Sequence, residues 1–276
     1  MQVITFSRQI GSLGDVIAAI VAREKGFRLI GPAQVHERAE TCDPEFKDIC
    51  VMYETEKGPG FWERFFFDTP VYLALFEALT YEFASEGKVV LIGRGSQLVL
   101  RDVPGVFSVR TVAPTDVRVQ RVAERLGLQK AQAAEFVRKH DRERRALIQS
   151  VFEHDVQDWT LYDLIINTEH YTAEGAAAVV CQGIDSLERA PEPEHWKERL
   201  SAMALAKRVE AVIKKRLTPV SASKVEAASG LNGEITLSGR VSDPKHKEKA
   251  EKIASEYPGV KSVVNKIVVT QFPYGY

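Results

Sequence analysis

The chain has 276 residues and a net charge of −1, with 45% hydrophobic and 27% charged residues, which excludes an intrinsically disordered protein. No apolar run approaches the roughly 20 residues of a transmembrane helix, and the N-terminus lacks the basic start and apolar core of a secretory signal. Cys42, Cys50 and Cys181 have neither disulfide-framework nor zinc spacing. We therefore expect a cytoplasmic protein with reduced thiols and no protein-bound metal.

The first part of the chain alternates apolar strands with helices. In chain order we expect strands at 2–6, 27–31, 87–95, 106–113 and 162–168, and helices at 15–26, over most of 34–86, and at 114–127, 129–150 and 172–184. Unbroken apolar strands are typical of burial on both faces, and their alternation with helices predicts an α/β fold with a parallel sheet flanked by helices. Ligands bind such sheets at the carboxyl ends of the strands.

Three polar segments follow expected strands. They are SRQIGSLGD at 7–15, GRG at 93–95 and NTEH at 167–170. Because the carboxyl ends of parallel strands share one edge of the sheet, we expect these segments to form a common site.

The segment 7–15 lies between a strand and a helix, as a phosphate-binding loop does. Gly11, Ser12 and Gly14 provide the backbone freedom that lets consecutive N–H groups point at an anion. The full motif G-x-x-x-x-G-K-[ST] has a lysine where this chain has Gly14 and a hydroxyl where it has Val16. Two chemical groups of the motif are therefore absent.

A second interpretation of the same loop is a capped helix. Ser12 and Asp15 form a variant of the capping box, in which side chains satisfy the first helical N–H groups. The carboxylate of Asp15 stabilises a helix start but repels a phosphate bound there. The loop alone supports both interpretations equally.

Arginines favour the phosphate site. In RKHDRERR, the helical spacing places Arg138, Arg142 and Arg145 on one face, and Asp141 is placed to orient Arg138 or Arg145. Arginine binds phosphate oxygens in pairs and stays charged, which suits phosphoryl transfer. The alternative is a solvated, salt-bridged helix surface.

Two further arginines stand beside expected strand ends. Arg8 directly precedes the loop, and Arg94 is the centre of GRG. Both are therefore candidates for anion binding.

Four segments resemble the cytidylate kinase-like family, in order over most of residues 1–185. They are ITFSRQIGSLGDVIA, VVLIGRGSQLVLRDVPGVFSVRTVAPTDVRVQRV, RKHDRERR and LYDLIINTEHYTAEGAAAVV. The resemblance implies a P-loop nucleoside monophosphate kinase fold, ATP with Mg²⁺, and a pyrimidine monophosphate acceptor such as CMP or dCMP. It assigns the phosphate loop to Gly11, Ser12 and Gly14, the acceptor site to Arg94, and an arginine-bearing lid to Arg138, Asp141, Arg142 and Arg145.

This chain departs from the family's usual loop GSGGRE. Leu13 replaces a glycine and Asp15 replaces the arginine. We take Arg8 as a residue that reaches the phosphates from the other side of the loop. Two functions follow as alternatives, a nucleoside monophosphate kinase that transfers phosphate in line, and a catalytically inactive nucleotide-binding sensor.

The charge changes sign along the chain. From Leu200 onward there are 13 Lys and Arg against 7 Asp and Glu, a net +6, whereas the preceding residues carry 24 against 31, a net −7. The change coincides with a proline-containing, charged stretch without apolar periodicity. We expect a nucleotide-binding domain at 1–186, a linker at 187–198 and a second domain at 199–276.

The second domain reads helix, strand, strand, helix, strand, with a helix at 202–217, a strand at 233–241, a helix from 243 and a strand at 260–270. The pattern NGEITLSGRVSDPKHKEKAEKIASEYPGVKSVVNKIVV resembles the BON domain, a small α-β-β-α-β fold of the α+β class. We expect a non-catalytic module that binds a protein or a small ligand.

Two other partners of the second domain are less favoured. Its helix carries Lys245, Lys247, Lys249 and Lys252, which a membrane surface would attract, but a solvated face is the simpler explanation. Aromatic stacking residues are sparse, which argues against nucleic acid.

Overall fold

The computed structural model describes residues 3–31, 33–35, 37–38, 61–187, 194–217 and 224–270, without the side chains of 61–69. The chain forms two compact units, one from residues 1–34 and 86–193 and the other from residues 35–85 and 194–276. Part of the expected linker lies outside the described residues, and its last part already belongs to helix α9 (Trp196–Arg216). The domain boundaries expected from the sequence stay a prediction.

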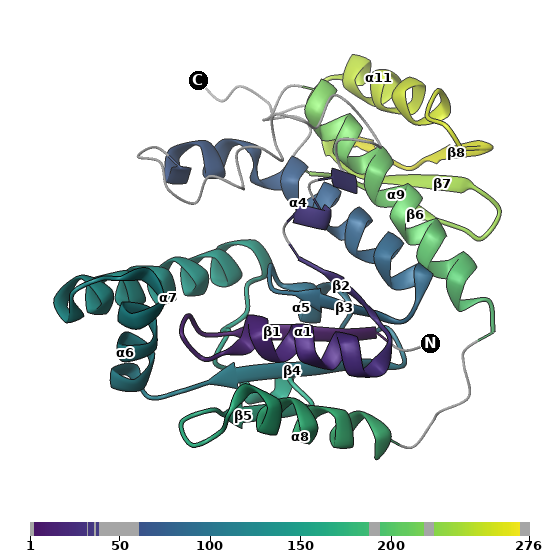
Figure 1. Ribbon diagram of the computed structural model, residues 1–276. Coiled ribbons are helices and arrows are strands. Elements are labelled where there is room, and N and C mark those ends of the chain that lie inside the picture. Colours follow the sequence, from purple (N-terminus) through teal and green to yellow (C-terminus); the bar gives the residue numbers. More distant parts are fainter. Residues whose placement is uncertain are drawn as a thin grey trace. The chain divides into compact units, whose positions relative to one another are not determined.

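The first unit contains a five-stranded sheet, as predicted (Figure 1). Its strands are β1 (Val3–Arg8), β2 (Arg28–Ile30), β3 (Val89–Ile92), β4 (Val106–Val112) and β5 (Leu164–Asn167). They lie in the order β2-β3-β1-β4-β5, and all neighbours pair in parallel. The central strand β1 therefore delivers its carboxyl end, and the segment after it, to the middle of the sheet edge.

The two faces of β1 and β4 differ in chemistry. On one face, Ile4, Phe6 and Val109 pack with α1 (Gly14–Lys25) and α8 (Ala173–Asp185) in a buried apolar core. On the opposite face, alternate positions carry polar side chains. These are Thr5, Ser7, Ser108 and Arg110, all buried.

Two helices follow β4 in the chain. They are α6 (Thr115–Leu126) and α7 (Lys130–Phe152), and they pack around a small core of Val119, Val122, Ala133 and Val137. Two short elements escaped the sequence prediction, α5 (Ser96–Val99) after β3 and the 3-10 helix η2 (Trp159–Leu161) before β5. Four and three residues are too few to show a periodic pattern.

The second unit contains α4 (Phe61–Glu86), α9, β6 (Val225–Ser229), β7 (Glu234–Val241), α11 (Pro244–Ser255), β8 (Ser262–Asn265) and β9 (Val268–Val269). The C-terminal elements confirm the predicted α-β-β-α-β order, with β6 antiparallel and β8 parallel to β7. The expected last strand is split, and β9 pairs with a later part of β7 than β8 does. None of the described helices is long and apolar enough to span a membrane.

Helices α4 and α9 are joined by buried charges. Lys207 of α9 lies 2.7 Å from the carboxylate of Glu77 on α4 and 3.2 Å from that of Glu210. Glu210 is 2% exposed and also accepts hydrogen bonds from Lys214, at 2.5 Å, and from the N–H of Ala227, at 3.1 Å. These contacts tie α4 to α9 and α9 to β6.

The pKa values in this cluster follow from the charge balance. Burial lowers the pKa of Lys207, but the charges of Glu210 and Glu77 and hydrogen bonds to both outweigh it, so the pKa is raised above 10.5. Burial raises the pKa of Glu77, and the attraction of Lys207 offsets this only in part. Because Lys207 lies between two carboxylates, the attraction of both favours its charged form.

Of the three cysteines, only Cys181 lies among the described residues, where it is a free, buried thiol. Burial raises the pKa of this thiol, which keeps it protonated and unreactive. This agrees with the expected structural role.

Candidate phosphate-binding site

The segment between β1 and α1 forms a tight turn at the carboxyl end of the central strand. The N–H of Ser12 donates to the carbonyl of Gln9 at 3.2 Å, and Gly11 and Leu13 have positive φ angles of 79° and 61°. Successive residues of alternating backbone hand form a concave nest of N–H groups, the geometry that binds anions. Gly11 has a further constraint, because a β-carbon there would lie 2.8 Å from the carbonyl oxygen of Arg118.

The predicted capping box is wrong. Leu13 is the N-cap of α1 and makes no side-chain hydrogen bond to the helix. Ser12 is fully buried, and its hydroxyl lies 2.8 Å from the Thr111 hydroxyl and donates to the carbonyl of Gln9 at 2.8 Å. The serine thus ties the loop to β4 instead of covering the helix start, which leaves the first N–H groups of α1 open to a ligand.

Side chains from later parts of the chain hold the loop carbonyls. Arg118 donates to the carbonyl of Ile10 at 3.3 Å, and the Thr168 hydroxyl donates to that of Ser12 at 3.1 Å. In a planar trans peptide the C=O and N–H groups point in opposite directions. The N–H groups of Gly11 and Leu13 therefore point away from these partners, and neither has an acceptor in the part of the chain that the structure describes.

Two more arginines support the same turn. Arg121 donates to the carbonyl of Thr168 at 2.8 Å and to that of Gly11 at 3.5 Å. Arg144 donates to the carbonyl of Arg8 at 2.7 Å. The sequence analysis missed Arg118, Arg121 and Arg144, although the first two share a face of the expected helix directly after β4, which was a usable signal.

Arg8 occupies the space beside the loop. Its Nε donates to the Asp15 carboxylate at 2.9 Å, and its guanidinium lies against the α-carbon of Gly93. A β-carbon at Gly14 would lie 2.5 Å from Cβ of Arg8 and would also meet the hydroxyl of Thr111. A lysine side chain therefore does not fit at position 14 in this packing, and the cation beside the loop is Arg8.

The ion pair with Arg8 also changes the electrostatic effect that Asp15 has on a bound phosphate. Its carboxylate was expected to repel a phosphate at the helix start. Because the negative charge is paired with an arginine, the repulsion is reduced.

The expected lid residues lie on α7. Arg138 is 69% exposed and pairs with Glu135 at 2.6 Å. Arg142 and Arg145 are exposed and have no ion pair among the described residues. The proposed roles of these three arginines stay a prediction.

Asp141 has a different partner from the one expected. It does not orient Arg138 or Arg145 but pairs with Arg118 through both carboxylate oxygens, at 3.0 and 2.8 Å. Arg118 is only 3% exposed, so this is where a counter-charge stabilises most. Asp141 thereby fixes the arginine that holds the loop carbonyl of Ile10.

Arg94 lies in the turn between β3 and α5. It has a φ of 56°, between Gly93 and Gly95, which also have positive φ. A side chain at Gly95 would meet the ring of Phe152, and one at Gly93 would meet Arg8. The turn is thus packed against both the Arg8 side chain and the end of α7.

The described residues contain no group of three or more His, Cys, Asp or Glu side chains that could hold a metal ion. The hydroxyl of Ser12 is engaged with Thr111 and Gln9, and Val16 has none. The loop itself therefore does not fit a protein-held Mg²⁺.

Two protein-family models match this chain. The model of the cytidylate kinase-like family matches residues 3–170, more than half of the chain. The chain belongs to this family. The BON domain model matches residues 201–271.

The curated relatives support the same assignment at a distance. A cytidylate kinase of Pyrococcus horikoshii is 31% identical over 118 residues, which cover 43% of this chain and 60% of the relative. A cytidylate kinase of Methanocaldococcus jannaschii is 27% identical over 110 residues, 39% of this chain and 62% of the relative. The chain thus spans about 60% of the length of these cytidylate kinases.

A solved structure supports the fold. An uncharacterized protein from Eubacterium ventriosum superposes with a TM-score of 0.55 at 21% identity and covers 67% of this chain and 99% of that one. Its likeness concerns the arrangement of the elements alone.

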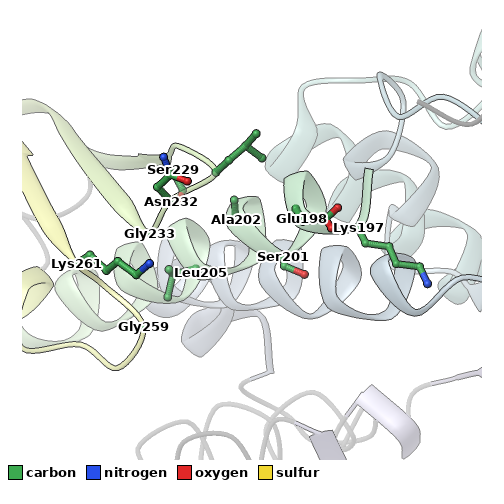
Figure 2. A pocket seen from close by; sticks show the side chains of 11 residues that line it. Lys197, Glu198, Ser201, Ala202, Leu205, Ser229, Asn232, Gly233, Gly259 and Lys261 are labelled. Atoms are coloured by element: carbon green, nitrogen blue, oxygen red, sulfur yellow. The ribbon is translucent and has the colours of Figure 1, made fainter. Parts of the chain in front are cut away.

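The second unit has a pocket of its own, of about 490 Å³. Figure 2 shows Ala202 and Leu205 on α9, with Ser229 at the end of β6 and Asn232 in the β6–β7 turn beside them. Lys197, Glu198 and Lys261 add charges of both signs to its lining. The lining therefore combines apolar, polar and charged side chains.

Proposed function

We propose that this protein is an ATP-dependent nucleoside monophosphate kinase that phosphorylates a pyrimidine monophosphate such as CMP or dCMP. The observation that carries the proposal is the set of loop carbonyls that accept hydrogen bonds from protein side chains, those of Arg118, Arg121 and Thr168. Because the C=O and N–H groups of a peptide point in opposite directions, the N–H groups of Gly11 and Leu13 are turned away from these partners and are available to an anion.

In this mechanism the protein supplies position and positive charge. The loop N–H groups and the start of α1 hold the ATP phosphates, and Arg8 takes the place of the missing lysine. Arg94 binds the acceptor, and Arg138, Arg142 and Arg145 close over the transferring group. The acceptor oxygen attacks the γ-phosphorus in line and ADP leaves, with no covalent enzyme intermediate. Mg²⁺ enters as part of the ATP complex, since the described residues offer it no ligand set.

The test measures ADP formation from MgATP with a panel of nucleoside monophosphates. We expect turnover with CMP or dCMP. Arg8→Met is expected to lower the affinity for ATP by about 10- to 100-fold, because a charge-assisted phosphate contact is lost. Arg142→Ala is expected to lower kcat with little change in ATP affinity, because its exposed side chain acts only when the lid closes.

A matched control is Arg125→Ala, an exposed arginine in the last turn of α6. It is expected to leave both constants unchanged. Full ATP affinity in Arg8→Met contradicts the role of Arg8. Binding of ATP or CMP without turnover on any acceptor replaces the enzyme by the nucleotide-binding sensor.

For the second unit we propose a binding module for a protein or small ligand, located with the kinase in the cytoplasm. The pocket on α9, with its mixed apolar and charged lining, supports this role. Cell fractionation with an antibody to the full chain tests the compartment, and recovery in the membrane fraction contradicts it.

A further inference from the structure

Four charged side chains are buried among the described residues: Arg110, Arg118, Arg208 and Glu210. Three of them have a counter-ion, which is Asp141 for Arg118, Glu82 for Arg208, and two lysines for Glu210. Arg110, 7% exposed on β4, has no carboxylate partner within the described part of the chain. A buried guanidinium is rarely left without a negative partner, because desolvation of the charge is costly.

The contacts of Arg110 engage only one end of its guanidinium. Nη1 donates to the hydroxyl of Ser7 at 2.9 Å and to that of Tyr162 at 3.1 Å, and the Tyr162 ring centroid lies 5.3 Å from Cζ. Nε and Nη2 have no acceptor among the described residues. These two groups form one side of the planar fork, the side that binds two oxygens of a phosphate at once.

The position of Arg110 fits a contact with the phosphate-accepting substrate rather than with ATP, the phosphate donor. It lies opposite Ser7 in the register of β1 and β4, and Ser7 directly precedes Arg8. Because side chains alternate along a strand, Ser7 and Arg8 face opposite sides of the sheet. A group held by Arg110 therefore lies close to the phosphate loop but on the other face of β1.

We propose that Arg110 binds the phosphate monoester of the acceptor through Nε and Nη2, with Ser7 and Tyr162 as positioning residues. The proposal rests on the proposed function, because it takes the acceptor to be a nucleoside monophosphate. The substrate phosphate then supplies the counter-ion that the described residues do not offer to Arg110.

The experiment compares the full chain with Arg110→Met, a substitution of similar length without charge. Titration calorimetry with CMP and with cytidine separates the phosphate from the nucleoside. We expect CMP to bind wild type more tightly than cytidine, and Arg110→Met to weaken CMP by about 10- to 100-fold without affecting cytidine. We also expect the Tm of the free variant to rise by about 2 °C or more, because an unpaired buried charge is gone.

Two controls sharpen the result. Arg125→Met, on an exposed surface, is expected to change neither CMP affinity nor Tm. Arg110→Lys keeps the charge but not the fork and is expected to recover only part of the CMP affinity. Inorganic phosphate is the second probe, and binding as tight as that of CMP contradicts an acceptor site.

Unchanged CMP affinity in Arg110→Met overturns the inference, and so does a lower Tm of the free variant, since a structural arginine would stabilise the empty protein. No preference of wild type for CMP over cytidine overturns it as well. The two proposals fail separately. Without any turnover, an Arg110-dependent preference for CMP retains the site and removes the kinase, whereas turnover with an unchanged KM for CMP in Arg110→Met removes only the site.

Discussion

At Gly14, the neighbouring side chains decide which residue type fits the loop. Arg8 passes over the α-carbon and Thr111 lies beside it, so the position that carries lysine in the full phosphate-loop motif is closed here. The absence of the lysine and the placement of Arg8 thus go together, because the Arg8 side chain occupies the space that a side chain at position 14 needs. A cation is retained, but it comes from the last residue of β1.

Gly14→Ala is expected to destabilise the protein by about 1–3 kcal/mol, because the new β-carbon overlaps Arg8 and Thr111 in a packed site. This outweighs the roughly 0.5–1 kcal/mol by which alanine favours a helix over glycine. Urea unfolding measures the difference.

Gly175→Ala, in the first turn of α8, is the matched control, because the nearest atom to its β-carbon is 3.3 Å away. The hydroxyl of Thr172 needs to move by only a few tenths of an ångström, so the loss of stability is expected to be well below that of Gly14→Ala. Equal stability of the two variants contradicts the packing described around Gly14.

The residues that shape the loop show where sequence reasoning ends. The glycines and Arg8 were found because they lie together in the chain between a strand and a helix. Arg118, Arg121 and Thr168 act on the same loop from more than 100 residues away, and their role depends on pairings that no local pattern encodes. Ser12 was misassigned for the same reason, since its partner Thr111 is on another strand.

At the scale of the elements, the side chain of Arg118 links α6, α7 and the segment after β1. Arg118 on α6 contacts Asp141 on α7 and the carbonyl of Ile10 after β1. The apolar core between α6 and α7 sets their packing, and the ion pair connects that packing to the loop.

Asp141→Asn is expected to destabilise the protein by about 2–3 kcal/mol and to weaken ATP binding. Removal of one partner leaves the buried charge of Arg118 uncompensated, which costs about 3–5 kcal/mol in a fully buried pair. The 29% exposure of the Asp141 side chain places the effect below that range. Chemical denaturation and ATP titration measure the two effects.

Glu135→Gln is the control on the same helix, because its pair with Arg138 is exposed on both sides. It is expected to change stability by less than about 1 kcal/mol. A similar loss in both variants would mean that Asp141 acts only as a surface charge.

The elements themselves were largely predictable. Apolar stretches that alternate with helical patterns identified all five strands of the parallel sheet, and the apolar alternation within 233–241 identified the main strand of the second sheet. The split between β8 and β9 was missed, although the N–H of Ile267 donates there to the Asn265 side chain, a local turn that asparagine favours. The order of the strands follows from tertiary packing, which no local pattern encodes.

At the scale of the whole molecule, the compact units do not follow the chain. Residues 35–85 come between β2 and β3, yet they belong with residues 194–276. Within this unit, Lys207 and Arg208 of α9 pair with Glu77 and Glu82 of α4. Composition alone indicated a break near residue 190, but it did not indicate that residues 35–85 belong to the second unit.

Lys207→Met is expected to destabilise the second unit by about 2–3 kcal/mol at pH 7, because Glu77 loses its cation and Glu210 keeps only Lys214. The folded pKa of Lys207 is raised, so its contribution is complete below pH 10.5 and is lost as the pH rises through the folded pKa. The difference in unfolding free energy between wild type and variant should stay constant from pH 7 to 10 and shrink above that.

Lys252→Met is the control, because Lys252 is exposed and lies 3.8 Å from Glu256. It is expected to change stability by less than about 1 kcal/mol. A difference for Lys207→Met that shrinks well below pH 10 contradicts the raised pKa.

The hydrogen bond from Thr168 to Ser12 spans 156 residues of the chain and has a consequence for protein synthesis. A ribosome adds about 5–20 residues per second, so roughly 8–30 s separate the synthesis of the loop from that of the threonine that completes it. During that interval the carbonyl of Ser12 lacks its hydrogen-bond partner. Nucleotide binding should therefore begin only after β5 has been made, and nucleotides should not assist the folding of shorter nascent chains.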